Sequence, residues 1–250
     1  MKGFKESSIN DIDKVLTSER KESCFVRIET GKSIKVRILP ALEKFDEDSY
    51  LFKYHVHNFS FIVDPETGIQ KKFLSVFCPK NHGEHCPFCE KSIKIYQKAK
   101  ELEKVSPDKA KKLSDLNYRY FKASENIACR VIVKGGNEIQ PKFLDMKRAM
   151  LKFIKMAFQE GKTPTHPAKG NYITMSKILK DPAKQDKYWN IEYTAMVGDE
   201  VVSFEEEQWE AILENAKPYK EVYKGNIKSE QAIKEIYKQI NQKFIEELKQ

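Results

Sequence analysis

Hydrophobic residues alternate with polar ones in several short stretches of the chain, and this pattern predicts β-strands. The first stretches form two expected hairpins, one from residues 25–28 and 34–38 and a longer one from 50–63 and 69–78. Further strands are expected at residues 118–133, 138–143, 172–179 and 188–196. Short strands joined by turns therefore dominate the middle of the chain.

Helical segments show hydrophobic residues that recur every three or four positions. We expect helices from Cys89 to about residue 104, at 106–116 and at 147–158, followed by two C-terminal helices. Ser203 is expected to cap the first of these, and the second is expected at residues 229–248. Near the N-terminus, Ser7 or Ser8 can cap a short amphipathic helix.

Three of the five cysteines lie within twelve residues, as Cys78, Cys86 and Cys89. Their spacing, C-x7-C-x2-C, lets two thiolates of a tight turn and one more sulfur approach a single tetrahedral metal ion. A redox C-x2-C pair needs no third cysteine, and a disulfide framework favours an even number. The pattern predicts one structural Zn²⁺. The fourth ligand is open among four histidines, which are His55, His57, His82 and His85.

Together these elements predict an α+β fold, namely a five-stranded OB-fold barrel with an inserted zinc-binding subdomain and C-terminal helices. Residues 1–22 are expected to form an N-terminal arm and helix suited to a protein–protein contact, which a family resemblance assigns to self-association. Residues 23–200 form the OB-fold core, with the zinc subdomain at about residues 50–115. Residues 201–250 form C-terminal helices that pack on the core.

The formal net charge of +8 is concentrated in the middle of the chain. Residues 51–190 carry 27 basic and 14 acidic side chains, a net charge of +13, whereas residues 191–250 carry 8 and 13, a net charge of −5. The basic stretch is also rich in aromatic residues. Lysines and arginines that contact phosphates, interleaved with rings that stack on unpaired bases, favour single-stranded nucleic acid as the partner.

Other function classes find less support in the sequence. The chain has no long apolar run, so neither a membrane span nor a signal peptide is expected. The thiols indicate the cytoplasm or another reducing space. The phosphate-binding, dinucleotide-binding, zinc-protease and serine-hydrolase motifs are absent. We therefore expect a binding protein rather than an enzyme, with no catalytic residues.

Several motifs, taken in order, resemble one known family. They are Val36–Pro40, a histidine-containing strand, the cysteine cluster, Cys129–Lys134, Lys142–Phe143 leading to Lys147–Arg148, Gly161–Pro164 and Gly170–Ile173. In this order the chain resembles the single-stranded DNA-binding (helix-destabilising) proteins of T-even bacteriophages, from about residue 23 to the final helices. The resemblance implies an OB-fold with one zinc ion, and cooperative, sequence-independent coating of single strands during DNA replication, recombination and repair.

The resemblance also implies roles for individual residues. The zinc ligands would be His57, Cys78, Cys86 and Cys89, with His55 as the alternative histidine. The nucleic-acid-binding residues would be Tyr118, Arg119, Lys122, Arg130, Lys134, Phe143 and Lys147. The implied partners are single-stranded DNA, further copies of the chain along the strand, and replication or recombination proteins, in an infected bacterial host cell.

Three departures from the family pattern bear on these expectations. The basic N-terminal motif carries fewer charges here, lysines at positions 180, 184 and 187 replace expected aromatic residues, and no acidic C-terminal tail follows the last helix. The alternatives are an RNA-binding or transcription-associated zinc module, a metal-dependent nuclease, and a zinc-stapled protein–protein adaptor.

Overall fold

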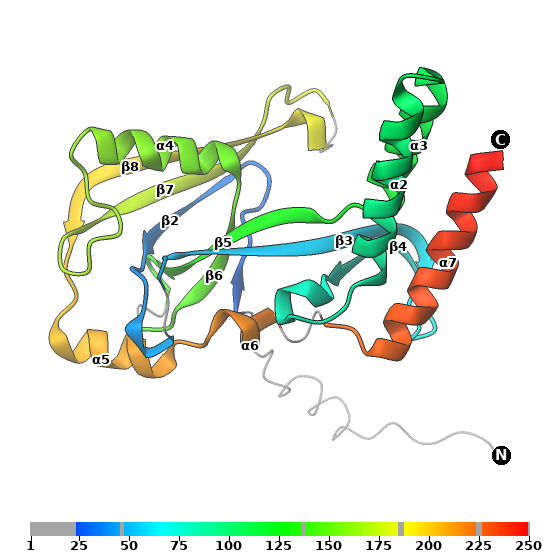
Figure 1. Cartoon of the computed structure of the whole chain (residues 1–250). Coiled ribbons are helices and arrows are strands. Elements are labelled where there is room, and N and C mark those ends of the chain that lie inside the picture. Colours follow the sequence, from blue (N-terminus) through cyan, green and yellow to red (C-terminus); the bar gives the residue numbers. More distant parts are fainter. Residues whose placement is uncertain (1–23, 46–47, 137–138, 185–187, 224–226, 250) are drawn as a thin grey trace, which may run out of the picture.

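The protein has a mixed α+β fold with a mostly antiparallel sheet (Figure 1). This computed structural model describes residues 24–45, 48–136, 139–184, 188–223 and 227–249. The predicted N-terminal arm and helix, residues 1–22, lie outside the described residues.

Eight strands form the sheet. They are β1 (Phe25–Val26), β2 (Lys32–Ile38), β3 (Leu51–Val63), β4 (Gln70–Phe77), β5 (Ser124–Val133), β6 (Lys142–Met146), β7 (Gly170–Leu179) and β8 (Ile191–Val202). The main path runs β1-β6-β5-β2-β7-β8, and β3 and β4 branch from β5. Among the described residues β1 and β8 end this path, so the sheet is open and the predicted closed five-stranded barrel is not shown.

The branch arises because β5 shares one edge between two partners. Residues 124–129 of β5 pair with the first half of β3, and residues 131–133 pair with β2. Beyond Val56, β3 leaves β5 and pairs with β4 as a long hairpin. The predicted hairpin of residues 50–63 and 69–78 is therefore confirmed, and it extends away from the rest of the sheet (Figure 1).

The predicted hairpin of residues 25–28 and 34–38 is wrong. β1 pairs in parallel with β6, and both edges of β2 are taken by β5 and β7. The turn before β2 is directed toward β7, because the amide of Gly31 donates a hydrogen bond to the carbonyl of Lys177 at 2.7 Å. The alternation of residues indicated the strands but not their partners.

The helices surround the sheet on several sides (Figure 1). They are α2 (Pro87–Glu103), α3 (Pro107–Tyr120), α4 (Arg148–Gln159), α5 (Glu206–Asn215), α6 (Tyr219–Tyr223) and α7 (Glu230–Lys249), with short 3₁₀ turns η1 (Glu43–Phe45), η2 (Pro79–His82) and η3 (Tyr188–Asn190). The strand predicted at 118–133 begins only at Ser124, because α3 continues to Tyr120 and buries Leu113 and Leu116 at helical spacing. The helix expected to begin at Ser203 begins at Glu206, where Glu205 and Gln208 form a capping box.

Two hydrophobic clusters hold most of these elements together. The α4 core lies between α4 and the sheet, and includes Val36, Ile38, Cys129, Val131, Leu144, Met150, Ile154 and Ile173. The α7 core joins the β3–β4 hairpin to α2, α3 and α7, and includes Phe59, Ile62, Leu74, Phe88, Leu116, Phe121, Ile236, Ile240 and Phe244. Two smaller clusters lie beneath α6 and α5.

A buried arginine fixes the loop before β7 to the sheet. The Arg37 side chain is fully buried and donates hydrogen bonds to the carbonyls of Ile38, Pro164 and His166. Burial lowers the pKa of Arg37 to about 10. Its guanidinium lies against Gly170, where an added Cβ would come within 1.7 Å of Arg37 Cζ. A side chain at the first residue of β7 would therefore displace the buried guanidinium.

The second half of β3 has one edge that β5 does not cover, and α7 satisfies part of it. The Gln239 side chain accepts a hydrogen bond from Val63 N and donates one to Val63 O, at 3.1 and 3.0 Å. Lys243 donates to the carbonyl of Phe61 at 2.6 Å. Phe61 has a φ of +52°, the one positive value for a non-glycine residue in the described chain. This conformation is uncommon for a bulky side chain.

Candidate metal centre

The β3–β4 hairpin positions the first two members of a His/Cys cluster. His57 lies on β3 opposite Val76, and Cys78 directly follows β4. The amide of Cys78 donates to the carbonyl of His55 at 2.9 Å, and the Asn81 side chain bonds both the amide and the carbonyl of His55, at 3.0 and 2.8 Å. The main chain on either side of the cluster is thereby fixed to the strand.

The two other cysteines come from the start of α2. η2 ends at Gly83, whose φ of +77° lets the chain reverse direction. Cys86 then takes the N-cap position of α2, Pro87 occupies the first turn, and the amide of Glu90 donates to the Cys86 carbonyl at 3.1 Å. Proline is well suited to a first turn because its missing N–H would have no partner there. This start of the helix directs Cys86 and Cys89 toward the hairpin.

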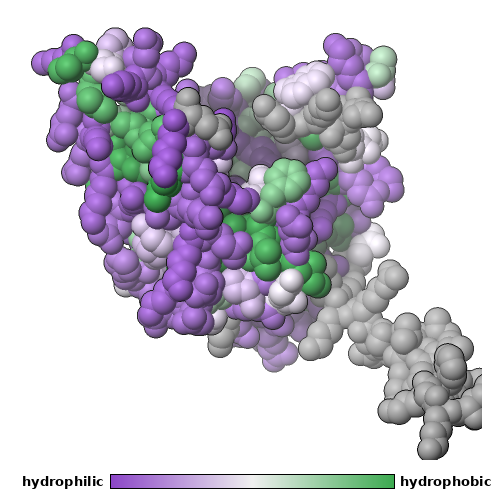
Figure 2. All heavy atoms as spheres, turned by 90° about the vertical axis from the view of Figure 1, so that its right-hand side faces the viewer, coloured by the Kyte–Doolittle hydropathy of each residue, from purple (hydrophilic) through white to green (hydrophobic). Residues whose placement is uncertain are grey.

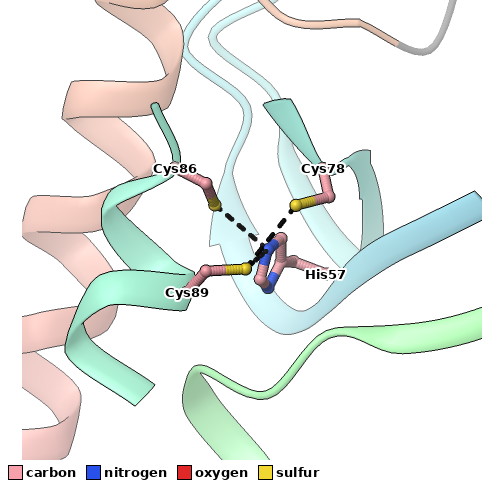
Figure 3. A group of neighbouring side chains, drawn as sticks. All are labelled: His57, Cys78, Cys86 and Cys89. Carbon is pink, nitrogen blue, oxygen red and sulfur yellow. Dashed lines mark hydrogen bonds between the residues drawn. The ribbon is translucent and has the colours of Figure 1, made fainter. Parts of the chain in front are cut away.

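The four side chains converge on one point, as Figure 3 shows. One ligand atom of each of His57, Cys78, Cys86 and Cys89 lies within 4.8 Å of the others. His57 Nε2 is 3.3 Å from Cys86 Sγ and 3.6 Å from Cys89 Sγ, and Cys78 Sγ is 3.6 Å from Cys89 Sγ. A tetrahedral ion with metal–sulfur bonds of about 2.3 Å requires sulfur–sulfur edges of about 3.8 Å. The cluster therefore has the dimensions needed to hold a metal ion.

Burial and charge also fit a cation at this point. His57 and Cys86 are fully buried, and all five cysteines of the chain are free thiols. Hydrogen bonds to Cys86 and Cys89 raise the pKa of Cys78, whereas hydrogen bonds from Cys78 and Cys89 lower the pKa of Cys86. Without a metal ion, the three cysteines therefore favour a state with a single thiolate, at Cys86, which accepts hydrogen bonds from the other thiols. A bound divalent cation would stabilise all three as thiolates.

The structure distinguishes between the candidate histidines. His57 joins the cluster, whereas the side chain of His55, two residues earlier on β3, is exposed. His85 Nε2 lies 2.9 Å from a carboxylate oxygen of Glu90, and the His82 ring packs on Phe77 at 5.2 Å. The expected ligand set of His57 with the three cysteines is the one that the structure brings together. Cys24 and Cys129 lie elsewhere, and burial raises the pKa of Cys129.

Three of the residues expected to bind nucleic acid share one concave surface. Tyr118, Arg119 and Lys122 line a concavity of about 1080 Å³, formed where α3 ends near β3 and the start of β5. Arg148, at the start of α4, lines it as well. We call this concavity the α3 groove. It was not foreseen that Arg148 would belong to it, although the adjacent Lys147 was a candidate.

Two other candidates are buried, which corrects the expectation that they contact a strand. Arg130 is 1% exposed, and its guanidinium lies 4.2 Å from the Tyr219 ring centroid while donating to the carbonyl of Lys217. Phe143 is 2% exposed and packs beneath α6. Both side chains point to the face of the sheet that α6 covers, and this helix was not predicted. Because α6 was not expected, the strand pattern predicted that this face of the sheet would be exposed to solvent.

The two remaining candidates are exposed but lie outside the α3 groove. Lys134 follows β5, where its Nζ lies 2.7 Å from a Glu200 carboxylate oxygen and 4.8 Å from the Tyr172 ring. Lys147 precedes α4, with its Nζ 5.9 Å from the Tyr193 ring.

Comparisons with known proteins identify no relative: no protein-family model and no curated protein matches this chain. Among the described helices, none combines the length and apolar character that crossing a membrane would require.

Proposed function

We propose that this protein binds single-stranded DNA without sequence preference, and that its His/Cys cluster holds one structural zinc ion. The observation that carries the proposal is the α3 groove, because it gathers Tyr118, Arg119 and Lys122 in one concavity whose lining also includes Asn58, the residue after His57 on β3. These residue types supply the stacking and phosphate contacts that such binding requires.

The α3 groove combines an accessible ring with nearby cations. Tyr118 is 71% exposed, and Lys122 Nζ lies 5.4 Å from its ring centroid. The lining carries three basic side chains, Arg119, Lys122 and Arg148, and two acidic ones, Asp115 and Glu125. Arg148 lies 3.6 Å from a Glu125 carboxylate oxygen, and Arg119 is paired with Glu247 at 2.5 Å. An unpaired base can stack on Tyr118 while its phosphates contact Lys122 and Arg148. Figure 2, which views the side of α2, α3 and α7, shows a largely hydrophilic surface with separate hydrophobic patches.

Zinc is the metal that fits the donor set best, because three thiolates and one imidazole in a tetrahedral arrangement are typical of structural zinc sites. When bound, the ion would supply cross-linking rather than chemistry. His57 and Cys78 hold one end of the hairpin, while Cys86 and Cys89 hold the start of α2. Since α3 packs on α2, the cluster fixes the helix that carries Tyr118.

The proposal also includes the fold and the biological setting. An OB-type barrel would be built from the strands around β5, with β2 and β3 sharing one edge of β5. Residues 1–22 would mediate self-association along the strand. The biological setting would be phage-type DNA replication, recombination and repair, in the cytoplasm of an infected host.

The test is a titration of fluorescent oligo-dT with purified protein at several salt concentrations. We expect binding to weaken as salt rises, and Lys122→Gln to reduce the log–log slope by about 0.7, because one phosphate contact is lost. Tyr118→Ala should weaken binding about tenfold through lost stacking. Lys234→Gln removes the same charge from an exposed position on α7 and serves as the matched control.

Other outcomes would contradict the proposal. Affinity that ignores salt, or equal effects of Lys122→Gln and Lys234→Gln, would remove the α3 groove from the function. Tighter binding to a matched RNA would favour an RNA-binding module. Degradation of the labelled strand with added magnesium would reveal a nuclease, and no binding at low salt would favour a protein–protein adaptor.

A further inference from the structure

A second pocket lies on the sheet face that α6 covers. It has a volume of about 370 Å³, within the range of small-ligand sites, and is bordered by β1, β3, β4, β5, β6 and α6. Its position is linked to the α3 groove, because the Asn58 side chain lines both. The two concavities therefore adjoin at Asn58.

Packed aromatic rings form the floor of the pocket. The Tyr54 and Phe77 rings are stacked with centroids 5.5 Å apart, and Phe77 and Tyr223 are stacked at 5.4 Å. Phe25 meets Tyr223 edge-on at 5.1 Å. Because Tyr54, Phe77 and Tyr223 are nearly fully buried, this floor is held rigidly by its neighbours. Of the four rings only Phe25 is partly exposed, so the floor gives the pocket a rigid apolar wall in which Phe25 is the ring that a flat ligand can reach.

Above this floor, one carboxylate is held in place by two hydroxyl groups. The Tyr54 and Tyr223 hydroxyls both donate to Asp145 Oδ1, at 2.7 and 3.3 Å. Burial, with Asp145 adding to it, raises the pKa of both tyrosines, which therefore remain donors at neutral pH. Asp145 is itself exposed, and within the described chain its Oδ2 accepts no hydrogen bond. An oriented acceptor thus faces the pocket.

Two more polar side chains line the pocket. The Asn126 side chain makes no hydrogen bond to a described residue, and Arg27 forms no ion pair with one. The lining therefore offers a carboxylate acceptor, an amide that both donates and accepts, and a cation, above an aromatic floor. A nucleotide presents the matching set, with an amino donor, ring acceptors, a phosphate and a flat base.

We propose that this pocket receives one unpaired base that carries an exocyclic amino group, at one end of the strand bound in the α3 groove. The inference rests on the proposed function and adds a local base preference to otherwise sequence-independent binding. The amino group of cytosine, adenine or guanine donates to Asp145, and Arg27 contacts the adjoining phosphate. Thymine has no amino group and turns a carbonyl toward the carboxylate, which leaves Asp145 without a donor.

Two sources could supply such a base, namely a DNA strand and a free nucleotide. The shared lining at Asn58 favours the strand, because it places the pocket next to a surface that can bind the phosphates on either side. If the source is a strand, oligo-dC should compete far better than CMP at the same nucleotide concentration. CMP that competes as well as oligo-dC would overturn the strand as the source.

The deciding experiment compares oligo-dC with oligo-dT, two pyrimidine strands of equal length, on the zinc-loaded full chain at pH 7.5. We expect wild-type protein to bind oligo-dC more tightly. Asp145→Asn should weaken oligo-dC binding about fivefold to tenfold and should not weaken oligo-dT binding, because the tyrosine hydroxyls hold the amide oxygen and the NH2 group that faces the pocket can donate to a thymine carbonyl but not to an amino group. Asp199→Asn removes the same charge from a side chain that is 95% exposed on β8, and should leave the preference intact.

The possible results separate the base pocket from the proposed function. Equal binding of the two strands by wild-type protein, or an equal loss for both strands in Asp145→Asn, would overturn the base pocket while the proposed function stands. No binding of either strand would overturn both. Should Asp145→Asn fail to fold, Asn126→Ala removes a different polar group from the lining. It is expected to reduce the oligo-dC preference in the same direction, and an unchanged preference would overturn the proposal.

Discussion

The α7 core and the α4 core solve the same problem, the packing of helices on strands, by different means. The α4 core places one helix on a broad sheet, and its hydrophobic side chains come from β2, β5, β6, β7 and β8. The α7 core places three helices on a single hairpin that projects beyond the sheet. A two-stranded hairpin offers little area for packing, so this region is reinforced by side chains of another kind.

Those reinforcements are polar and lie at both ends of the hairpin. The His/Cys cluster joins the base of the hairpin to α2. At the hairpin turn, Lys228 lies 3.1 Å from Asp64 and 2.7 Å from Glu66, just before α7 begins. We therefore expect the α7 core to respond to metal removal and to acid, and the α4 core to respond to changes in packing.

The largest effect is expected from loss of the metal centre. With zinc in the cluster, as proposed above, Cys86→Ser should abolish stoichiometric metal binding and cost on the order of 5 kcal/mol of stability in the α7 core. Metal analysis and hydrogen exchange measure this. Peptides of α2, α3 and α7 should lose protection, while peptides of α4 and β7 keep theirs. Cys24→Ser, outside the cluster, is the control, and an equal loss of protection in both cores would show that they unfold as one unit.

The second prediction concerns a substitution in the sheet that carries the α4 core, far from the metal ligands in sequence. Gly170→Ala should destabilise the protein by about 3 kcal/mol, because the new Cβ would overlap the buried Arg37 guanidinium. Urea unfolding measures the loss, and the metal content of the variant should equal that of the wild-type protein. In Gly198→Ala the added Cβ meets its nearest atom at 3.6 Å, an ordinary contact. Equal stability of the two variants would contradict the proposed role of Arg37.

A smaller, pH-dependent effect is expected at the hairpin turn. Lys228→Met should cost about 2 kcal/mol at pH 7, because the nearly buried Asp64 carboxylate loses its partner. Lys238→Met, on the exposed face of α7, is the control.

The pH dependence follows from the carboxyl groups. A hydrogen bond from Lys228 lowers the pKa of Glu66; burial tends to raise that of Asp64, but hydrogen bonds from Lys228 and the Glu66 amide lower it overall. Because these folded-state pKa values are depressed, the stabilisation is complete above about pH 5 and is lost as pH falls below about 4. The difference between wild type and Lys228→Met should therefore shrink in acid. A difference that stays constant from pH 7 to pH 3 would exclude this ion pair as its cause.

The smallest effect on stability is expected at Phe61, and this substitution should stabilise the protein where the others destabilise it. Phe61→Gly should stabilise the protein by about 1 kcal/mol or less, since glycine adopts a positive φ without strain. Phe73→Gly changes an equally exposed phenylalanine on β4 and should destabilise it by a similar amount. Thermal unfolding of both variants measures the difference, and a shift in the same direction would contradict strain at Phe61.

What the sequence predicted well depends on residues close together in the chain. The β3–β4 hairpin and the cysteine cluster follow from alternation and spacing within a short stretch. His55 and His57 lie two residues apart on one strand, so alternation alone could not choose between them. The choice depends on α2, which packs where His57 lies and leaves His55 exposed.

What the sequence did not predict depends on distant partners. The strand pattern of β1 and β2 gave no sign that they would pair with β6, β5 and β7 instead of each other. Arg130 resembled a surface cation until α6 and the preceding Lys217 enclosed it, 87 residues later in the chain. Tyr118 and Arg148 lie in separate helices, and only the folded chain brings them to one groove.

The long strand β3 has a consequence for how the protein is made. His57 and Cys89 are separated by only 32 positions, and the hairpin that joins them is local in sequence. On a ribosome, the whole ligand set emerges before β5 does, and well before α7. Local pairing forms faster than pairing between distant segments. We therefore expect the nascent chain to bind its metal ion before the rest of the sheet forms. β3 would then already be fixed at one end when β5 pairs with it and the remaining strands add to β5.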